Sequence, residues 1–462
     1  MRYVCAGLAC VAAIANAAGA QIPIRTVSAP SATLAQSLGN ISGIRELADG
    51  RLLVNDDGRR LLLVFDKQLA TAEILADSTS GAANSYPRGA RLIPYLADST
   101  LVVNRPDAAL LVIDPYGKLA RIAAPPVPQH MNSLSSGQPI GTDARGRLVY
   151  QVNPAARGIS VPCPAPLTPP PPGPSPDTAY IVRGDFDTRT ADTIAKVRIQ
   201  PFISAKLTRD GACKVTGATL MVNPVPPPID AWTVTSDGAA VIVRGLTYQV
   251  DRIGADGTFA TAPKLPFAWR RLTDNEKQAK IDSARTIIDS LTNLGGCRLQ
   301  SCRGGNVTSF TTNPPRNGND GGGLGRLGDA NFTTDRVGAR PAGGAVGSAA
   351  ELGAALGSND CQSFVVAPEF AAPAEMADYM PPIRGGAVLA DRDGNVWIIP
   401  ATSLEAKGGG LLYDVVNRNG ELAERVQLPP NRTVVGFGRG GVVYLSWLDA
   451  TGWHIERRTI DR

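Results

Sequence analysis

Histidines, cysteine motifs and long apolar runs are scarce in this sequence, and each shortage excludes a class of protein. The chain of 462 residues has only two histidines, His130 and His454, and no CxxC pair. A zinc site built from cysteine and histidine is therefore not expected. Aromatic residues make up 5% of the chain and the formal charge is +5, with both signs interspersed, which does not describe a nucleic-acid-binding surface. Beyond the first 20 residues, no stretch approaches the roughly 20 apolar residues that a membrane span requires.

The first 20 residues have the pattern of a secretory signal peptide. An apolar run covers Val4 to Ile14 and is followed by the small residues Ala18-Gly19-Ala20, which predict cleavage before Gln21. The alternative is a lipid anchor on Cys10, because Leu8-Ala9-Cys10 resembles a lipobox. Either pattern indicates export, and the mature chain is expected to be a periplasmic or secreted monomer without a transmembrane segment.

A turn followed by a β-branched run recurs along most of the chain. The stretch Ala390–Ile399, ADRDGNVWII, defines the pattern. Related stretches cover residues 47–56, 96–105, 142–152, 235–244 and 437–447, which makes about six copies. Glycines at the turn can supply the positive φ that a tight hairpin requires; they are Gly50, Gly146, Gly238, Gly394 and Gly440 or Gly441. The second copy has Ser99 in place of the glycine.

Each copy is part of a larger unit of four strands. In residues 41–77, four strand-like runs are separated by short turns, and four antiparallel strands in about 35 residues make one propeller blade. The first two units are offset by about 48 residues, close to known propeller repeats. The sequence therefore predicts an all-β fold, a six-bladed β-propeller of four-stranded antiparallel blades with one inserted helix and long irregular inserts. Residues 21–462 form a single domain in this interpretation.

Three inserts interrupt the repeat, at about 153–177, 200–228 and 268–380. The first is rich in proline, and the second allows an extra hairpin around Asp210-Gly211. In the third, Thr273 to Leu294 has a period of about 3.6 residues and a capping box of Thr273 and Glu276, which predicts a helix. Its apolar stripe consists of Ile281, Ala284, Ile288 and Leu291, and its charged residues Lys277, Lys280, Asp282 and Arg285 are expected to meet water.

The environment of this helix is also open to prediction. The stripe should pack on the propeller between blades four and five, with Phe267 and Trp269 beginning the contact, as a lid over the channel or as a structural plug. The glycine-rich residues Gly295 to Ala374 are expected to be irregular.

The last blade lacks a fourth strand in the C-terminal sequence. Only three strand-like runs follow residue 432, and a missing outer strand would leave an unpaired edge. The segment Ile22 to Pro30 is strand-like and unassigned, so we expect it to complete the last blade and to close the ring.

Cysteines predict disulfide staples in an oxidising compartment. Two of the seven cysteines, Cys5 and Cys10, leave with the signal peptide, and five remain. Cys163 and Cys213 flank the third blade and are expected to pair. Cys302 or Cys297 is expected to pair with Cys361, because closing a long loop removes more entropy from the unfolded chain than the short Cys297–Cys302 loop would.

Candidate ligand-binding residues follow from propeller topology. Loops between strands two and three and between blades open on the face that carries the inserts, here called the insert face. The tight glycine turns open on the other face, the turn face. Residues predicted to ring the insert face or to lie near the channel mouth are Asn55, Asp56, Asp57, Arg88, Arg105, Asp107, Asp230, Trp232, Arg244 and Arg384. The carboxylates could bind Ca²⁺, which prefers oxygen ligands; the alternatives are turn hydrogen bonds within the backbone and ion pairs between blades.

The six turn-and-strand copies and the outer turns VNRNG and IGADG resemble those of bacterial exported six-bladed β-propellers, the NHL-like and TolB-like group. That resemblance implies a central channel and a ligand-binding face, in a group that includes scaffold proteins, lactonases and lyases. No fixed motif of those enzymes is present, and neither histidine completes a Ser-His-Asp set. The sequence favours a non-catalytic propeller that binds a protein, peptide or glycan; the alternative is a Ca²⁺-dependent hydrolase or lyase of the lactonase kind.

Overall fold

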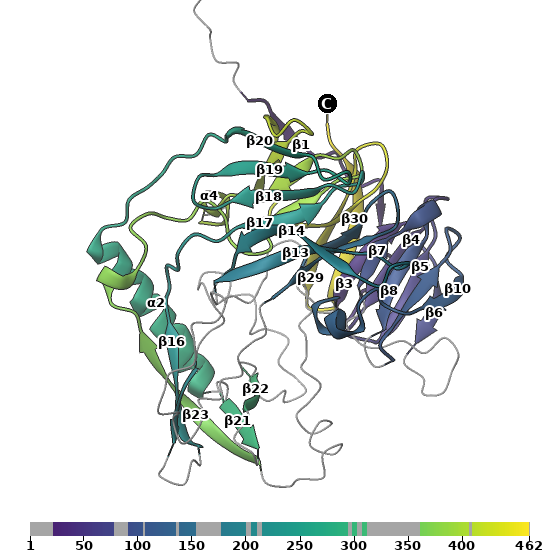
Figure 1. The fold of residues 1–462 in the computed structure, drawn as a ribbon. Coiled ribbons are helices and arrows are strands. Elements are labelled where there is room, and N and C mark those ends of the chain that lie inside the picture. The colour runs from purple at the N-terminus through teal and green to yellow at the C-terminus, as the bar shows by residue number, and fades with distance from the viewer. Residues whose placement is uncertain are drawn as a thin grey trace, which may run out of the picture.

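Six small antiparallel sheets are arranged as the blades of a propeller in a computed structural model of the chain (Figure 1). The structure describes residues 22–77, 91–104, 107–134, 138–153, 177–199, 205–209, 215–293, 298–302, 307–311, 361–405 and 409–461. Each blade has the strand order one to four from the channel outward. The predicted six-bladed β-propeller is therefore confirmed.

The first three blades come from consecutive parts of the chain. Blade one consists of β3 (Ile41–Glu46), β4 (Leu52–Asp56), β5 (Leu61–Phe65) and β6 (Ala72–Asp77). Blade two consists of β7 (Leu92–Pro94), β8 (Thr100–Asn104), β9 (Ala109–Ile113) and β10 (Leu119–Ala123). Blade three consists of β11 (Ile140–Thr142), β12 (Leu148–Val152), β13 (Thr178–Gly184) and β14 (Ala191–Arg198).

The other three blades follow, the last with a strand from the start of the chain. Blade four consists of β17 (Ala231–Val234), β18 (Ala240–Arg244), β19 (Gln249–Ile253) and β20 (Phe259–Lys264). Blade five consists of β24 (Val388–Ala390), β25 (Val396–Ile398), β26 (Leu412–Val416) and β27 (Leu422–Gln427), with β1 (Ile24–Thr26) added outside. Blade six consists of β28 (Thr433–Phe437), β29 (Val442–Asp449), β30 (Gly452–Thr459) and β2 (Ala32–Thr33).

Neighbouring blades pack face to face through the β-branched and leucine runs noted in the sequence. Strand β4 is buried at every position because both faces of its sheet are covered by other blades. Leu53 and Val64 of blade one pack with Val102 and Leu111 of blade two in one buried cluster. Fully burying such side chains stabilises the fold by about 1.5–3 kcal/mol each.

The N-terminal segment closes the ring, but with other residues than the sequence indicated. Ala32 and Thr33 pair antiparallel with Arg457 and Glu456 as the fourth strand of blade six. The segment predicted for this role, Ile22 to Pro30, also lies beside blade six: Val27 and Ile460 form an isolated bridge, Ser28 N donates to Thr459 O at 2.8 Å, and Asp461 N donates to Thr26 O at 3.0 Å. Its strand β1 pairs parallel with β27 as a fifth strand of blade five. The segment therefore spans the seam between the last two blades.

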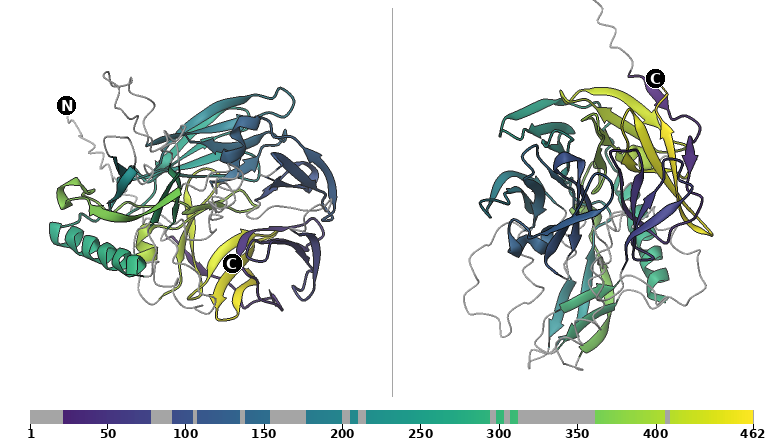
Figure 2. Two further views of the ribbon diagram at one scale, coloured as in Figure 1. Left: turned by 90° about the horizontal axis from the view of Figure 1, so that it is seen from below. Right: turned by 90° about the vertical axis from the view of Figure 1, so that its right-hand side faces the viewer.

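Two of the inserts join into a second sheet beside the propeller, here called the appended sheet. Within the insert at 200–228, strands β15 (Ala205–Arg209) and β16 (Val215–Val222) pair antiparallel, as in the predicted hairpin, whose turn at Asp210-Gly211 lies outside the described residues. The prediction of an irregular Gly295 to Ala374 is wrong for the strands β21 (Arg298–Cys302), β22 (Val307–Thr311) and β23 (Cys361–Phe370). Strand β16 pairs in parallel with β23, so insertions on both sides of blade four build one sheet. Figure 2 shows this unit far from blade two.

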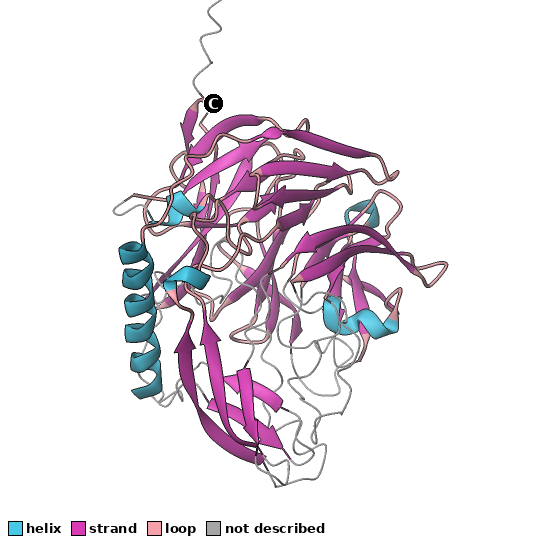
Figure 3. Ribbon diagram, turned by 60° about the vertical axis from the view of Figure 1, so that its left-hand side comes forward, coloured by secondary structure: helices cyan, strands magenta, loops and turns pink. Residues whose placement is uncertain are grey.

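Helix α2 (Asp274–Asn293) runs alongside the appended sheet (Figure 3). The predicted capping box is present, since Thr273 N donates to Glu276 Oε2 over 2.8 Å. Ile281 packs in a buried cluster with Val225, Ala371 and Met376, which lie at the base of the appended sheet. The prediction that the stripe packs on blades four and five is therefore wrong, because this cluster offers the stripe an apolar surface of its own.

One charged residue of α2 is buried, contrary to the sequence-based expectation. Lys277 is 3% exposed. Its ammonium donates to the carbonyls of Pro373 and Met376 and pairs with Asp378 at 2.9 Å. These bonds compensate the cost of removing the charge from water and tie α2 to the connection that leads into blade five.

The other helices in the described ranges are short and lie in the connections: α1 (Met131–Leu134), α4 (Ala401–Glu405), and the 3-10 turns η1 (Leu96–Asp98), η2 (Pro128–His130) and η4 (Pro373–Glu375). None of the helices in the described ranges is both long and apolar enough to cross a membrane. The signal peptide and the proline-rich residues 154–176 lie outside the described residues.

Candidate functional site

The turns between the first and second strands gather at one end of the channel. In five blades the turn contains a glycine with positive φ, between 67° at Gly440 and 84° at Gly394. The predicted role of these glycines is therefore confirmed. Blade two differs, because Ala97 (φ 51°) and Asp98 (φ 58°) adopt the left-handed region in its turn, whereas Ser99 has a φ of −72°.

This left-handed turn is a strained feature. An alanine in the left-handed region costs roughly 1 kcal/mol relative to the right-handed one. Such backbone strain persists only where the surrounding contacts over-determine it. The contacts that do so here are made by the Asp98 carboxylate, which the turn carries toward the channel axis.

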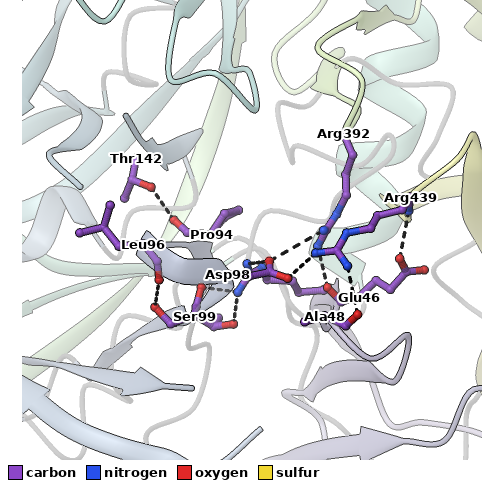
Figure 4. Close-up of polar contacts among 11 residues, drawn as sticks. Glu46, Ala48, Pro94, Leu96, Asp98, Ser99, Thr142, Arg392 and Arg439 are labelled. Carbon is purple, nitrogen blue, oxygen red and sulfur yellow. Dashed lines mark hydrogen bonds and ion pairs between the residues drawn. The ribbon is translucent and has the colours of Figure 1, made fainter. Parts of the chain in front are cut away.

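Arginines from three blades reach Asp98. Arg45 lies on β3 of blade one, Arg392 on the first turn of blade five and Arg439 on the first turn of blade six. We call these three arginines with Asp98 and Glu46 the turn-face cluster (Figure 4). Arg45 Nη2 lies 2.7 Å from Asp98 Oδ1, and Arg439 Nη2 lies 2.5 Å from Asp98 Oδ2. Arg392 Nη1 is 3.9 Å from Oδ1, outside hydrogen-bonding distance.

Arg45 and Glu46 are adjacent on β3, and strand geometry directs their side chains to opposite sides. Arg45, 6% exposed, turns to blade two, where Nη1 donates to Ser99 O and Thr100 Oγ1. Glu46 turns to blade six, where its carboxylate accepts Tyr444 Oη at 2.8 Å and Arg439 N at 3.0 Å. The end of one strand thus links both neighbouring blades.

Charge in the turn-face cluster is unbalanced. Three guanidinium groups approach the single carboxylate of Asp98, whereas the Glu46 carboxylate accepts Tyr444 Oη and the backbone amide of Arg439. Burial lowers the pKa of Arg45 to about 10; Asp98 opposes this effect, and the positive charges of Arg392 and Arg439 add to it. The guanidiniums therefore repel one another in a partly buried place.

The acidic run predicted for the insert face is buried in blade one. Asn55 and Asp56 are fully buried and Asp57 is 2% exposed. The Asp56 carboxylate accepts the backbone amides of Gly39 and Asn40 at 2.9 and 3.0 Å. This geometry matches the turn-forming alternative, in which the side chain satisfies backbone donors.

A second group of predicted residues forms one ion-pair network in blade four. Arg244 lies 2.8 Å from Asp230 and 2.7 Å from Asp251. The Asp230 carboxylate also accepts Gly245 N at 3.2 Å. Trp232 does not face the channel mouth; it is 3% exposed and donates to Gln151 of blade three at 2.8 Å. Packing against the neighbouring blade buries its ring.

The other predicted ligand residues are scattered. Asp107 is exposed and accepts the amide of Asn104 at 2.8 Å. Arg384 is partly buried at the entry to blade five. Arg88 and Arg105 lie outside the described residues.

Both histidines make local contacts. His130 Nδ1 lies 2.8 Å from the hydroxyl of Tyr150, which is buried in blade three. Burial lowers the pKa of His130 and raises that of Tyr150. His454 stacks on Trp447 with ring centroids 4.8 Å apart and lies 3.0 Å from Asp449. In the described part of the chain, neither histidine takes part in a group of three or more potential metal ligands.

An exposed aromatic patch lies where the appended unit meets blade four. Trp269 and Tyr379 are 42% and 47% exposed, and Arg271 pairs with Tyr379 across an isolated antiparallel bridge. Phe267 connects the patch to the propeller, with its ring 5.2 Å from Trp269 and 5.4 Å from the buried Tyr248. We call Trp269, Arg271 and Tyr379 the junction patch. It lies on the insert face, because both connections leave or enter a blade there.

Sequence reasoning did not find the turn-face cluster. Glu46 and Arg439 are separated by 393 residues, and the members of the cluster meet only when the ring closes. The missing turn glycine in blade two was the one local signal, since a departure from a repeated pattern often marks a site under other constraints.

Comparisons with known proteins find similar solved structures but do not identify a family or a function for this chain. No family model and no curated protein matches the chain. Solved structures that it resembles include virginiamycin B lyase from Staphylococcus aureus, at 9% identity, covering 92% of this chain and 97% of that one with a TM-score of 0.35. A gluconolactonase from Xanthomonas campestris matches at 10% identity, covering 93% and 89%, with a TM-score of 0.34. A calcium-binding protein, regucalcin, from Agrobacterium tumefaciens matches at 9% identity, covering 95% and 97%, with a TM-score of 0.36. At these values the likenesses carry no argument about function, and the chain is a six-bladed β-propeller on its own strand pairing.

Proposed function

We propose that this protein is an exported, non-catalytic binding propeller that presents its insert face to a protein, peptide or glycan. The observation that carries the proposal is the junction patch. Two large aromatic side chains stand in solvent there beside an arginine, although buried aromatic surface is the usual outcome of folding. Tryptophan, tyrosine and arginine are the residue types that dominate binding hot spots.

The appended unit supports the proposal because it holds the patch in place. Leu272 N donates to Asp378 O at 2.8 Å, and Met380 N donates to Arg270 O at 3.1 Å. These bonds join the connection that leaves blade four to the one that enters blade five. The aromatic side chains therefore stand on a braced two-stranded segment, and a preorganised site loses less entropy on binding.

The test is binding of purified protein to immobilised peptide and glycan arrays, followed by affinity measurement with the best probe. Replacing Trp269 and Tyr379 by alanine should lower the affinity more than tenfold, since a hot-spot side chain contributes about 2 kcal/mol. Tyr116→Ala is the matched control, because Tyr116 is 64% exposed on the turn face. That variant should bind as the unaltered protein does.

Two outcomes would contradict the proposal. Equal losses of affinity in Tyr116→Ala and in the Trp269 and Tyr379 variants would show that binding does not depend on the junction patch. Stoichiometric Ca²⁺ in the purified protein together with hydrolysis of a lactone panel would favour the lactonase-like alternative, in which a bound cation polarises a carbonyl.

A further inference from the structure

We propose that the turn-face cluster is a second binding site, on the opposite face from the junction patch, and that it takes an oxyanion, either a carboxylate or a phosphate group. The inference is independent of the proposed function. It rests on the donors that the arginines leave unused and on the approach of three guanidiniums to the one carboxylate of Asp98.

Arg392 has the largest unused capacity. Its Nη2 donates to the Glu46 carbonyl at 2.6 Å. In the described part of the chain, its Nη1 and Nε make no hydrogen bond, and its side chain is 23% exposed. A guanidinium offers five donors in a planar fork that matches a carboxylate or phosphate, so Arg392 retains one edge for an incoming anion.

Arg439 provides a second set of donors beside it. Its Nη1 donates to Ala48 O at 3.0 Å and its Nη2 to Asp98 Oδ2, and the side chain is 53% exposed. Nε of Arg439 makes no hydrogen bond within the described ranges. Because Arg392 and Arg439 both approach Asp98 (Figure 4), an anion seated against one is also attracted by the other.

The acidic residues on either side of Arg392 in sequence, Asp391 and Asp393, form no ion pair with it within the described ranges. The carboxylate of Asp391, next to Arg392 in sequence, accepts the backbone amides of Asp393 and Asn395 and the indole of Trp397. The Glu46 carboxylate is held by blade six. Asp98 itself shows that the cluster accommodates a carboxylate, and a free anion would be the second.

The site is preorganised by the backbone. Arg45 is fixed by Ser99 and Thr100, and the strained turn fixes Asp98. Donors that are already in place lose little conformational entropy when an anion binds.

The experiment measures thermal unfolding of the full mature protein in increasing phosphate, acetate or chloride at constant ionic strength and pH 7. We expect a saturable rise in Tm with phosphate or acetate over chloride, because a ligand that binds only the folded state stabilises it. The difference between phosphate and acetate identifies the preferred oxyanion.

Matched variants assign the effect to the cluster. Arg392→Met should abolish the anion-dependent rise in Tm. Arg392→Lys should strongly weaken it, because lysine retains the positive charge but lacks the planar guanidinium that binds an oxyanion through two hydrogen bonds. Arg418→Met is the control, since Arg418 is an exposed arginine on the same face that lies outside the cluster. Asp98→Asn should bind the anion at least tenfold more tightly, because the guanidiniums lose the negative charge that competes with the anion.

Three results would overturn the proposal. One is the absence of any shift in phosphate and acetate beyond that in chloride. Another is a shift that survives in Arg392→Met, and the third is an equal loss in Arg418→Met, since either would locate anion binding elsewhere on the surface.

Discussion

Neutralising Asp98 should cost the protein a measurable part of its stability. Asp98→Asn keeps the side-chain shape and a residue type that tolerates the left-handed backbone, so it changes charge with little change in strain. The buried Arg45 then loses the carboxylate at 2.7 Å, while the positive charges of Arg392 and Arg439 remain.

The expected magnitude follows from burial. Breaking a buried ion pair by removing one partner costs about 3–5 kcal/mol. Asp98 is 23% exposed and Arg439 is 53% exposed, so water recovers part of that cost. We expect a loss of about 2–3 kcal/mol in the free energy of unfolding, measured by urea denaturation at low salt, and a smaller loss at high salt.

Asp393→Asn is the matched control. Asp393 occupies the corresponding turn of blade five and is exposed, and no ion pair involves its carboxylate in the described residues. The same charge change there should cost less than about 0.5 kcal/mol. A double-mutant cycle of Asp98 and Arg392 tests the direction of the coupling. Arg392→Met should stabilise the Asp98→Asn variant, because it relieves repulsion among the arginines, but it should not stabilise the unaltered protein. Equal effects of Asp98→Asn and Asp393→Asn would refute the reasoning.

Other expectations concern pH, backbone strain and redox state. Burial lowers the pKa of His130, so the unfolded chain binds its proton first, and stability should fall as pH drops from 7 toward 5; a flatter profile is expected for His130→Gln, and an unchanged profile would exclude this histidine. Gly238→Ala should lower the free energy of unfolding by at least about 2 kcal/mol more than Gly257→Ala does, as measured by thermal unfolding. Both glycines have positive φ, but only a Cβ at position 238 would meet a neighbour, the Asp143 Cα at 2.3 Å. Equal losses in the two variants would show that this contact relaxes. Cys302 and Cys361 are register partners on β21 and β23, so non-reducing peptide mapping should find them joined, and a Cys297–Cys302 peptide would reverse that prediction.

Features that depend on a few neighbouring residues were predictable from the sequence. The turn glycines, the strand periods and the capping box of Thr273 and Glu276 each express a local conformational preference, and all occur in the structure. The repeat then multiplies a weak local signal by six, which is why the blade architecture could be inferred from one chain.

Features that depend on distant partners were not predictable. The hairpin of β15 and β16 was expected, but β16 also pairs in parallel with β23, whose residues lie almost 150 positions further along the chain. The periodicity of a strand predicts that it is a strand but does not indicate which distant strand it pairs with. Lys277 was expected in water because charge alone suggests exposure, whereas three oxygen atoms from a separate segment receive its ammonium. The same limit hid the turn-face cluster, which needs four blades to exist.

The pairing of β2 with β30 has a consequence for the order of events in synthesis. Ser31 donates to Arg457 across 426 positions of the chain, so blade six cannot gain its outer strand until almost the whole polypeptide has been made. Blades one to four contain only consecutive strands and can form earlier, as an open arc whose end blades expose apolar faces. A chain that stalls before β30 leaves the arc open to proteases and to pairing with other chains. The N-terminal strand β2 can therefore close the ring only in a chain that is long enough to include β30.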